Sequence, residues 1–147
     1  MSVYKRILVA TDFSDINRLA VERASVLAQQ DNCELILLHV IEHFPMDVGP
    51  LSSVFKNNTG PDDALAQHVR AKMNELVSTL EHQDIKTEFS ITSKSARHEI
   101  LRFAKAHGVD LIVVAPHGQG IIGTLGSTAS GVLNNAGCDV LAVREAD

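Results

Sequence analysis

Short runs of consecutive apolar residues alternate along the chain with segments in which apolar residues recur at helical spacing. The runs lie within residues 4–10, 33–41, 110–115 and 138–144, and each predicts a strand that is buried on both faces. A further segment, Ile85 to Thr92, alternates apolar and polar residues. This pattern predicts a strand at a sheet edge with one solvated face.

Four helices are predicted between these strands. The first follows Ser14 and continues to about Gln30, and the second extends from Asp62 to near His82. A third follows Ser95 and stops at Gly108, with Ala96, Ile100, Leu101 and Ala104 on its apolar side. The fourth covers residues 127–135, with Ala129, Val132 and Leu133 inward. Five strands alternating with four helices predict an α/β fold with a doubly wound parallel sheet.

The chain has 147 residues, which fits a single domain over residues 1–147. Hydrophobic residues make up 45% of it, yet no apolar run approaches the roughly 20 residues that a membrane-spanning helix needs. The first residues enter a predicted strand directly and lack the features of a signal peptide. We therefore expect a cytoplasmic protein without a membrane partner.

Charge and aromatic content argue against a nucleic-acid partner. The formal net charge is −5, lysines and arginines are scattered, and the chain contains no tryptophan and one tyrosine. Neither Cys33 nor Cys138 has a cysteine or histidine at metal-ligand spacing. We expect two buried, inert thiols.

A long connection is predicted at about residues 42–61. It contains three prolines and two glycines and shows little periodicity. Connections longer than about 12 to 15 residues are uncommon in compact domains unless they cover something or are disordered. Both interpretations, a lid beside a site and a disordered segment, are open.

A glycine-rich loop follows the apolar run at residues 111–115. Four glycines, from Gly118 to Gly126, precede Ser127 and Thr128 at the start of the last predicted helix. Glycines let backbone N–H groups approach an anion, and a helix N-terminus favours negative charge. Phosphate binding and a simple turn explain this stretch equally well.

Polar residues follow three of the predicted parallel strands. They are Thr11 and Asp12, then His39 beside Val40, and His117 beside Gly118. In open parallel sheets ligands bind at the carboxyl ends of the strands, where the strand order reverses, so these residues are expected to converge on one crevice. Asp12 either accepts hydrogen bonds from a ribose or caps its turn. His117 either donates to a phosphate or is an exposed loop residue.

Several other chemistries lack support. The pattern G-x-G-x-x-G at residues 118–123 follows the fourth strand, whereas the dinucleotide fingerprint belongs in the first β-α-β unit. No phosphate-reaching lysine motif is present, and no spacing assigns a base to Ser127. His39 and His43 are four residues apart, but a strand end and a loop do not place them on one helical face, so we reject them as a metal-binding pair. From these patterns together we expect no catalytic residue and no metal ligand. The remaining histidines are expected on polar helix surfaces or at helix ends: His68, His82, His98 and His107.

A combined pattern extends over nearly the whole chain. Its segments are Ile7 to Ser14, Leu37 to Val40, Asp110 to Val114, His117-Gly118, Gly126-Ser127 and Cys138 to Val143. With these segments the chain resembles the universal stress proteins. The resemblance implies a sheet in the order 3-2-1-4-5 with helices on both faces, of the adenine nucleotide alpha hydrolase-like type. It also implies a homodimer built through the last strand, Cys138 to Arg144.

In one branch of this family the resemblance implies binding of an adenine nucleotide, ATP or AMP, with magnesium accompanying ATP. Carried over, Ala10, Asp12 and Val40 would face adenine and ribose, with Thr11 beside them. The glycine motif G-x-x-G, followed after nine residues by G-[ST], would begin at Ala115. His117 and Gly118 would then lie by ribose and phosphate. The phosphates would be held by Gly126, Ser127 and Thr128.

The sequence departs from that motif at two points. Ala115 stands at the first glycine position, and seven residues, Gln119 to Leu125, separate Gly118 from Gly126. In length this segment is similar to the branch whose members do not bind ATP, although that branch usually lacks the glycines present here. The chain is intermediate between the two branches.

Three functions follow from this comparison. The first is a cytoplasmic stress-response dimer that binds an adenine nucleotide in the crevice bounded by Asp12, Val40, Gly118 and Ser127. The second is a stress-response dimer of the same fold that binds no nucleotide and acts through protein partners. The third, a slow nucleotide hydrolase, has the least support because no motif provides a general base or a metal carboxylate.

Overall fold

The structure of the protein, a computed structural model, describes residues 2–42, 64–116 and 126–144. Its strands are β1 (Arg6–Ala10), β2 (Glu34–Glu42), β3 (Ile85–Thr92), β4 (Leu111–Val114) and β5 (Asp139–Ala142). Its helices are α1 (Asp15–Asp31), α3 (Ala64–Ser78), α4 (Ala96–Ala106) and α5 (Ser127–Asn135). The predicted long connection lies outside the described residues, except for Glu42, which is the last residue of β2.

The five strands form one parallel sheet in the order β3-β2-β1-β4-β5. From β1 the chain adds β2 and then β3 toward one edge, and β4 and β5 lie on the other side of β1. The strand order therefore reverses between β1 and β4. The predicted doubly wound α/β fold and its strand order are confirmed.

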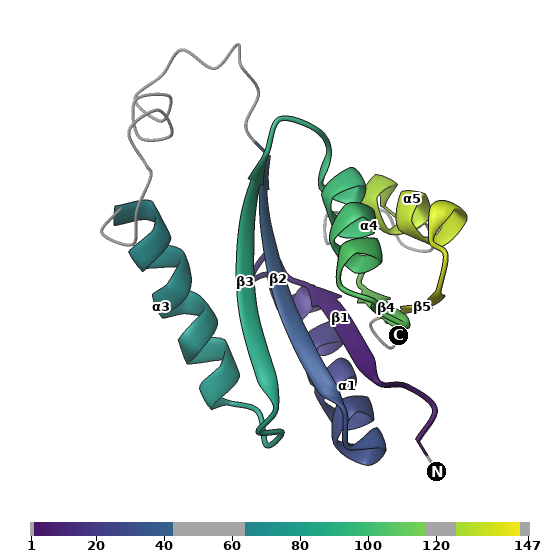
Figure 1. Cartoon of the computed structure of the whole chain (residues 1–147). Helices are drawn as coiled ribbons and strands as arrows, with labels where there is room; N and C mark the ends of the chain where they lie inside the picture. The colour runs from purple at the N-terminus through teal and green to yellow at the C-terminus, as the bar shows by residue number, and fades with distance from the viewer. Residues whose placement is uncertain (1, 43–63, 117–125, 145–147) are drawn as a thin grey trace.

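Helices cover both faces of the sheet (Figure 1). On one face, α1 and α3 pack against Ile7 and Val9 of β1 in a cluster that includes Met73. On the other face, α4 and α5 pack against Leu8 and Ile112. Successive residues of a strand point to opposite faces, so continuous apolar runs in β1, β2 and β4 supply both clusters at once.

Two carboxylates fix the amino end of β1. Asp31 accepts hydrogen bonds from the backbone N–H groups of Val3 and Tyr4 at 3.0 and 2.7 Å, and Asp110 accepts from Lys5 and Arg6 at 2.9 and 3.0 Å. The sequence predicted a strand from Tyr4, whereas the paired strand begins at Arg6. The N–H groups of Val3, Tyr4 and Lys5 are bonded to carboxylates before the ladder begins.

The second helix is shorter than predicted. α3 ends at Ser78, and the next N–H groups, of Thr79 and Leu80, bond three residues back to Leu76 and Val77. Such i to i−3 bonds tighten the last turn of a helix. The chain then turns inward, so that His82 is buried and its Nε2 lies 2.7 Å from the Cys33 carbonyl oxygen. The prediction of a polar helix surface or a helix end was wrong for His82, because it lies buried in the chain beyond α3.

β3 is an edge strand, as predicted, but its solvated face was predicted incorrectly. Ile91 is 41% exposed, whereas Thr92 is buried and its hydroxyl accepts a hydrogen bond from the Lys94 N–H at 3.0 Å. Both α3 and α4 contact this strand, so each face is partly covered. Alternation of apolar and polar residues therefore did not identify a single buried face.

α5 has the predicted bounds, although one of its three predicted inward residues is wrong. Ala129 and Val132 are buried, whereas Leu133 is 48% exposed. In α4, Phe103 and Glu99 are buried in addition to the predicted Ile100 and Ala104. The predicted helical spacing of apolar residues was thus correct, but the predicted set of buried residues on each helix was not.

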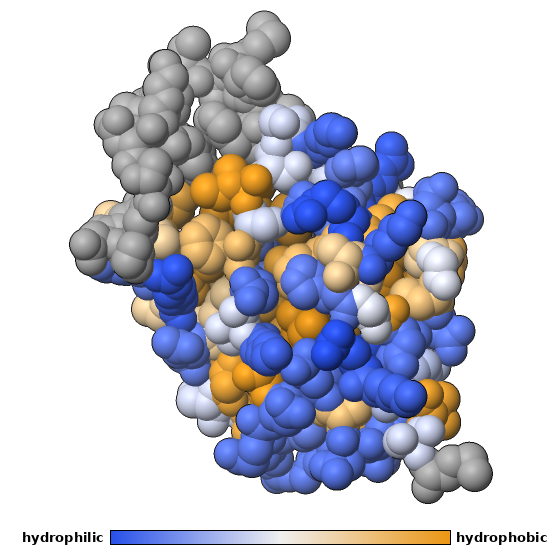
Figure 2. All heavy atoms as spheres, viewed as in Figure 1, coloured by the Kyte–Doolittle hydropathy of each residue, from blue (hydrophilic) through white to orange (hydrophobic). Residues whose placement is uncertain are grey.

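The outer surface is mainly hydrophilic in the view of Figure 2, where apolar residues are interspersed with polar ones. None of the helices in the described ranges has the length and apolar character needed to cross a bilayer. Cys33 is buried and Cys138 is half-buried, and burial raises the pKa of both thiols. Both thiols are therefore protonated near neutral pH, as unreactive cysteines are.

Candidate functional site

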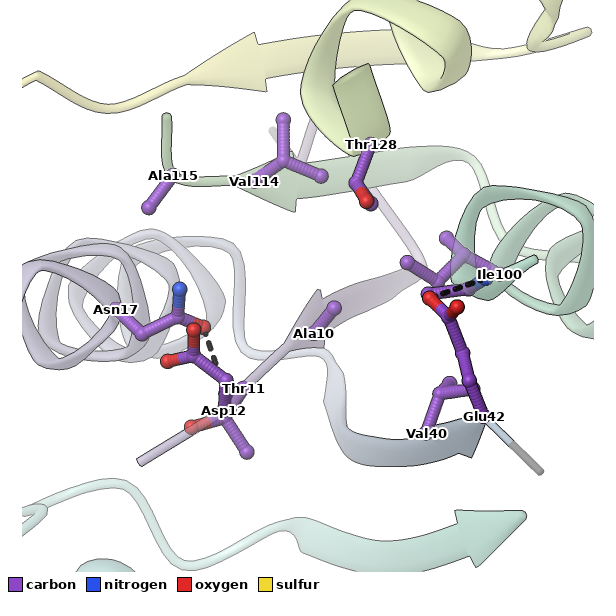
Figure 3. Close-up of a pocket in the computed structure, with 11 residues that line it drawn as sticks. Ala10, Thr11, Asp12, Asn17, Val40, Glu42, Ile100, Val114, Ala115 and Thr128 are labelled. Atoms are coloured by element: carbon purple, nitrogen blue, oxygen red, sulfur yellow. Dashed lines mark hydrogen bonds between the residues drawn. The ribbon is translucent and has the colours of Figure 1, made fainter. Parts of the chain in front are cut away.

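A cavity of about 190 Å³ opens at the carboxyl ends of β1, β2 and β4, where the strand order reverses (Figure 3). This is the position at which open parallel sheets bind ligands. The residues that line it are Ala10, Thr11, Asp12, Asn17, Val40, Glu42, Ala96, Ile100, Val114, Ala115 and Thr128.

Six of these lining residues were predicted from the sequence: Ala10, Thr11, Asp12, Val40, Ala115 and Thr128. Gly126 and Ser127 directly precede Thr128 and begin α5. His117 and Gly118 lie outside the described residues, as does the rest of the glycine-rich loop up to Leu125. The ends of β1, β2 and β4 therefore meet at one cavity, through Thr11, Asp12, Val40 and Ala115 among the predicted residues.

Sequence reasoning missed the lining residues that come from helices and from the end of β2. Asn17 lies in the first turn of α1, Ala96 begins α4, and Glu42 ends β2. Ligand sites at strand ends commonly include the first turn of the next helix, and this rule could have identified Asn17 and Ala96. Glu42 was missed because the strand was predicted to stop at Ile41.

The turn after β1 is fixed by its own side chains. The Thr11 hydroxyl accepts from the Phe13 N–H at 3.0 Å, Asp12 Oδ1 accepts from the Ser14 N–H at 2.9 Å, and Asn17 Oδ1 accepts from the Asp12 N–H at 3.1 Å. Phe13 adopts the left-handed conformation, with φ 66°. The turn-capping role weighed for Asp12 is therefore present, through one of its two carboxylate oxygens.

Ser14 caps α1, as predicted, because its hydroxyl accepts from the Asn17 N–H at 3.3 Å. Behind the turn, His39 Nδ1 lies 2.8 Å from the Thr11 carbonyl oxygen. A carbonyl oxygen only accepts, so this nitrogen carries the proton. The His39 ring also packs on Phe13, with 4.6 Å between ring centroids. His39 therefore supports the turn from β2, while its neighbour Val40 lines the cavity.

Among the described residues, no side chain caps the first turn of α5. Gly126 is its N-cap, with extended backbone at φ −66° and ψ 166°, and forms no side-chain capping bond. The Gly126 carbonyl accepts from Ser130, which closes the first helical turn. The N–H groups at the start of a helix favour an anion, and Ser127 and Thr128 add hydroxyl groups there.

Glu42 joins the end of β2 to the start of α4. Its Oε1 accepts a hydrogen bond from the Ala96 backbone N–H at 3.1 Å (Figure 3). The same helix is capped by Ser95, whose hydroxyl accepts from the His98 N–H at 3.3 Å. Two backbone N–H groups in the first turn of α4, those of Ala96 and His98, thus have side-chain partners.

The cavity combines an apolar surface from Ala10, Val40 and Ile100 with two carboxylates, two threonines and an asparagine. Such a site can enclose a flat apolar group and accept hydrogen bonds from its polar edge. Within residues 2–42, 64–116 and 126–144, no group of three or more potential ligand side chains is placed to hold a metal ion.

The fold and the strand-end cavity together define the class of α/β nucleotide-binding-like proteins with a 3-2-1-4-5 sheet. The model of the universal stress protein family matches residues 3–144. Universal stress protein A homolog 2 of Coxiella burnetii is 38% identical over 152 aligned positions, covering 98% of this chain and 97% of the relative. The chain belongs to the universal stress protein family.

Solved structures agree with this assignment. Universal stress protein UspA from Lactobacillus plantarum is 29% identical, with a TM-score of 0.76 over 98% of this chain and 100% of its own. A universal stress protein in complex with cAMP is 26% identical, with a TM-score of 0.67 over 97% of this chain and 98% of its own. The resemblance seen in the sequence is confirmed.

Proposed function

We propose that this protein binds an adenine nucleotide in the cavity between β1 and β4 and acts in the stress response. The supporting observation is the convergence of Asp12, Val40 and Thr128 on one cavity at the reversal of strand order. The complex of a 26% identical family member with cAMP supports an adenine-containing ligand. AMP and ATP, the latter with magnesium, are the ligands we expect.

In this proposal the base and the ribose bind at the side of the cavity formed by β1 and β2. Ala10 and Val40 supply apolar contacts, and Asp12 has a carboxylate oxygen beyond the one bonded to Ser14. A ribose hydroxyl donates well to such an oxygen, because hydrogen bonds to a charged acceptor are the stronger kind. Thr11 and Ala115 contribute to the walls on either side.

The phosphates belong at the start of α5. Gly126, Ser127 and Thr128 present backbone N–H groups without a side-chain cap, together with two hydroxyls. His117 and Gly118 complete the site in this proposal, and their assignment rests on the sequence pattern alone.

Isothermal titration calorimetry with AMP, ATP and cAMP tests this function. Gly126→Leu should abolish binding, because a bulky side chain there fills the space that the phosphate needs. Asp12→Ala should weaken it by about 1 to 3 kcal/mol, the value of a hydrogen bond to a charged group. Saturable binding by the wild type and its loss in Gly126→Leu support the proposal. A wild type that binds none of the three contradicts it.

We further propose that the chain functions as a single cytoplasmic domain, residues 1–147, that forms a homodimer through residues 138–144. β5 is an edge strand, and an unpaired edge is a ready surface for a second strand. Replacing Leu141, central in β5, by proline should remove ladder hydrogen bonds and convert the dimer to a monomer in analytical ultracentrifugation.

A second function is favoured by the departures from the ATP-binding motif. Ala115 at the first glycine position and the loop two residues short both fit a dimer that binds no nucleotide and acts through protein partners. Catalysis is not part of either proposal. Magnesium-dependent release of ADP above the level of a Ser127→Ala variant would instead identify a slow hydrolase.

A further inference from the structure

Two carboxylates flank the cavity, one on each side of Ala10. Asp12 lies beside Asn17 on the α1 side, and Glu42 lies toward the start of α4 (Figure 3). The lining residues from the described parts of the chain include no lysine, arginine or histidine. At neutral pH this part of the cavity therefore carries negative charge.

The Glu42 carboxylate has a hydrogen bond to the protein, and the Glu42 backbone is positioned by the sheet. Its backbone belongs to β2 and is in register with Thr92 of β3, and its Oε1 accepts from the Ala96 N–H at 3.1 Å. A carboxylate at a helix N-terminus is favourable for that helix. Glu42 is exposed, and this hydrogen bond directs its carboxylate toward the start of α4 at the cavity wall.

We infer that Glu42 makes the site selective for adenine ligands of low negative charge. This inference rests on the proposed function. Adenosine, cAMP, AMP and ATP form a series of increasing negative charge, and like charges within about 10 Å repel measurably even near the protein surface. Each added phosphate therefore costs more affinity in the presence of Glu42. The start of α5, where Thr128 lines the cavity, offsets this repulsion for the first phosphate because a helix N-terminus favours negative charge.

Glu42→Gln tests this inference, because the amide oxygen still accepts from the Ala96 N–H while the charge is removed. The control is Glu88→Gln, which makes the same charge change at an exposed position of β3 outside the cavity lining. Dissociation constants for adenosine, AMP and ATP are measured by calorimetry at low salt with EDTA present.

Glu42→Gln should strengthen ATP binding by about threefold to tenfold, AMP binding by less, and adenosine binding by less than about twofold. Glu88→Gln should change none of the three. If Glu42→Gln fails to fold, the wild type provides the second measurement. Raising the salt concentration should then strengthen ATP binding relative to adenosine, because salt screens the repulsion.

Three results would overturn the inference. In the first, Glu42→Gln leaves the ratio of ATP to adenosine affinity unchanged while the wild type binds both, so only the charge role of Glu42 is wrong. In the second, Glu42→Gln weakens the binding of adenosine, so Glu42 forms a direct hydrogen bond with the nucleoside. In the third, the wild type binds no adenine ligand, and the proposed function fails together with the inference.

Discussion

Asn17 and Asp12 are joined by a hydrogen bond across the start of α1: Asn17 Oδ1 accepts from the Asp12 backbone N–H at 3.1 Å. This bond fixes the end of β1 to the first turn of the helix that follows it. Both residues line the cavity, so the bond also sets where the Asp12 carboxylate lies. The rigidity of the turn and the geometry of the site therefore depend on the same contact.

Asn17→Ala should lower both stability and nucleotide affinity. The loss of one hydrogen bond lowers the free energy of unfolding by about 0.5 to 1.5 kcal/mol. Affinity falls because the turn that carries Asp12 loses its bond to α1, and the bond from the Ser14 N–H to the Asp12 carboxylate remains. Urea denaturation and calorimetry measure the two effects. Asn134→Ala, at an exposed position of α5, is the matched control and should change neither. Unchanged affinity in a folded Asn17→Ala variant would show that nucleotide binding does not depend on this hydrogen bond.

The packing of α4 on α5 predicts a second result, at Gly131. A Cβ at this position would lie 2.4 Å from Arg97 Cδ, so the Arg97 side chain must move to admit alanine. Alanine in a helix interior is favoured over glycine by about 1 kcal/mol. Gly131→Ala should therefore stabilise the protein by up to that amount in an Arg97→Ala background and by clearly less in the wild type. Equal effects in the two backgrounds, measured by chemical denaturation, would show that Arg97 does not restrict this position.

Glu99 and Arg102 predict how stability changes with pH. Arg102 forms an ion pair with the buried Glu99, and this pair together with the Ser90 hydroxyl lowers the pKa of Glu99 against the opposing effect of burial. A carboxyl whose pKa is lower in the folded state stabilises the fold above its unfolded pKa, about 4.3 for glutamate. This contribution is lost as the pH falls through the folded value.

Glu99→Gln should consequently be less stable than the wild type at pH 7, and the difference should shrink below about pH 4. Urea denaturation at several pH values measures it. Glu22→Gln removes the exposed pair with Arg18, which has an N–O distance of 3.5 Å, and should have little effect at any pH. A difference for Glu99→Gln that stays constant from pH 7 to pH 3 would exclude the ion pair as its cause.

The sequence predicted most of the fold because buried parallel strands have an unambiguous pattern. The runs at β1, β2 and β4 could only be strands covered on both faces, and the helices between them fixed their parallel direction. The predictions were wrong where contacts between distant residues determine the bounds or the burial of a segment. Asp31 accepts from the Tyr4 N–H 27 positions away, and the contact between His82 and the Cys33 carbonyl joins residues 49 positions apart. Local periodicity contains neither fact.

The sequence predicted the part of the candidate site that lies at the ends of the strands. The rule for parallel sheets identified Asp12 and Val40 at the ends of two strands, whereas Ala115 came from the family resemblance. Ile100 reaches the cavity from the second turn of α4, and its place depends on how that helix packs on the sheet. No sequence pattern encodes that packing directly.

Neighbouring residues of α5 predict a contrast in stability. Val132 is completely buried between α4 and the sheet, whereas Leu133 is 48% exposed. Val132→Ala should lower the free energy of unfolding by about 1 to 3 kcal/mol, since it removes buried methyl groups and leaves a cavity. Leu133→Ala should change it by less than about 0.5 kcal/mol. The reverse order, measured by thermal or chemical denaturation, would contradict the orientation of α5.

The location of the ligand is the central claim, and two-dimensional ¹H–¹⁵N NMR during titration with AMP tests it most directly. The account predicts saturable shifts concentrated at Thr11, Asp12, Val40 and Thr128, with little change along the groove between α4 and the end of α5 that Leu101 and Ala136 line. Saturable shifts confined to that groove, or no shifts at all, would contradict it.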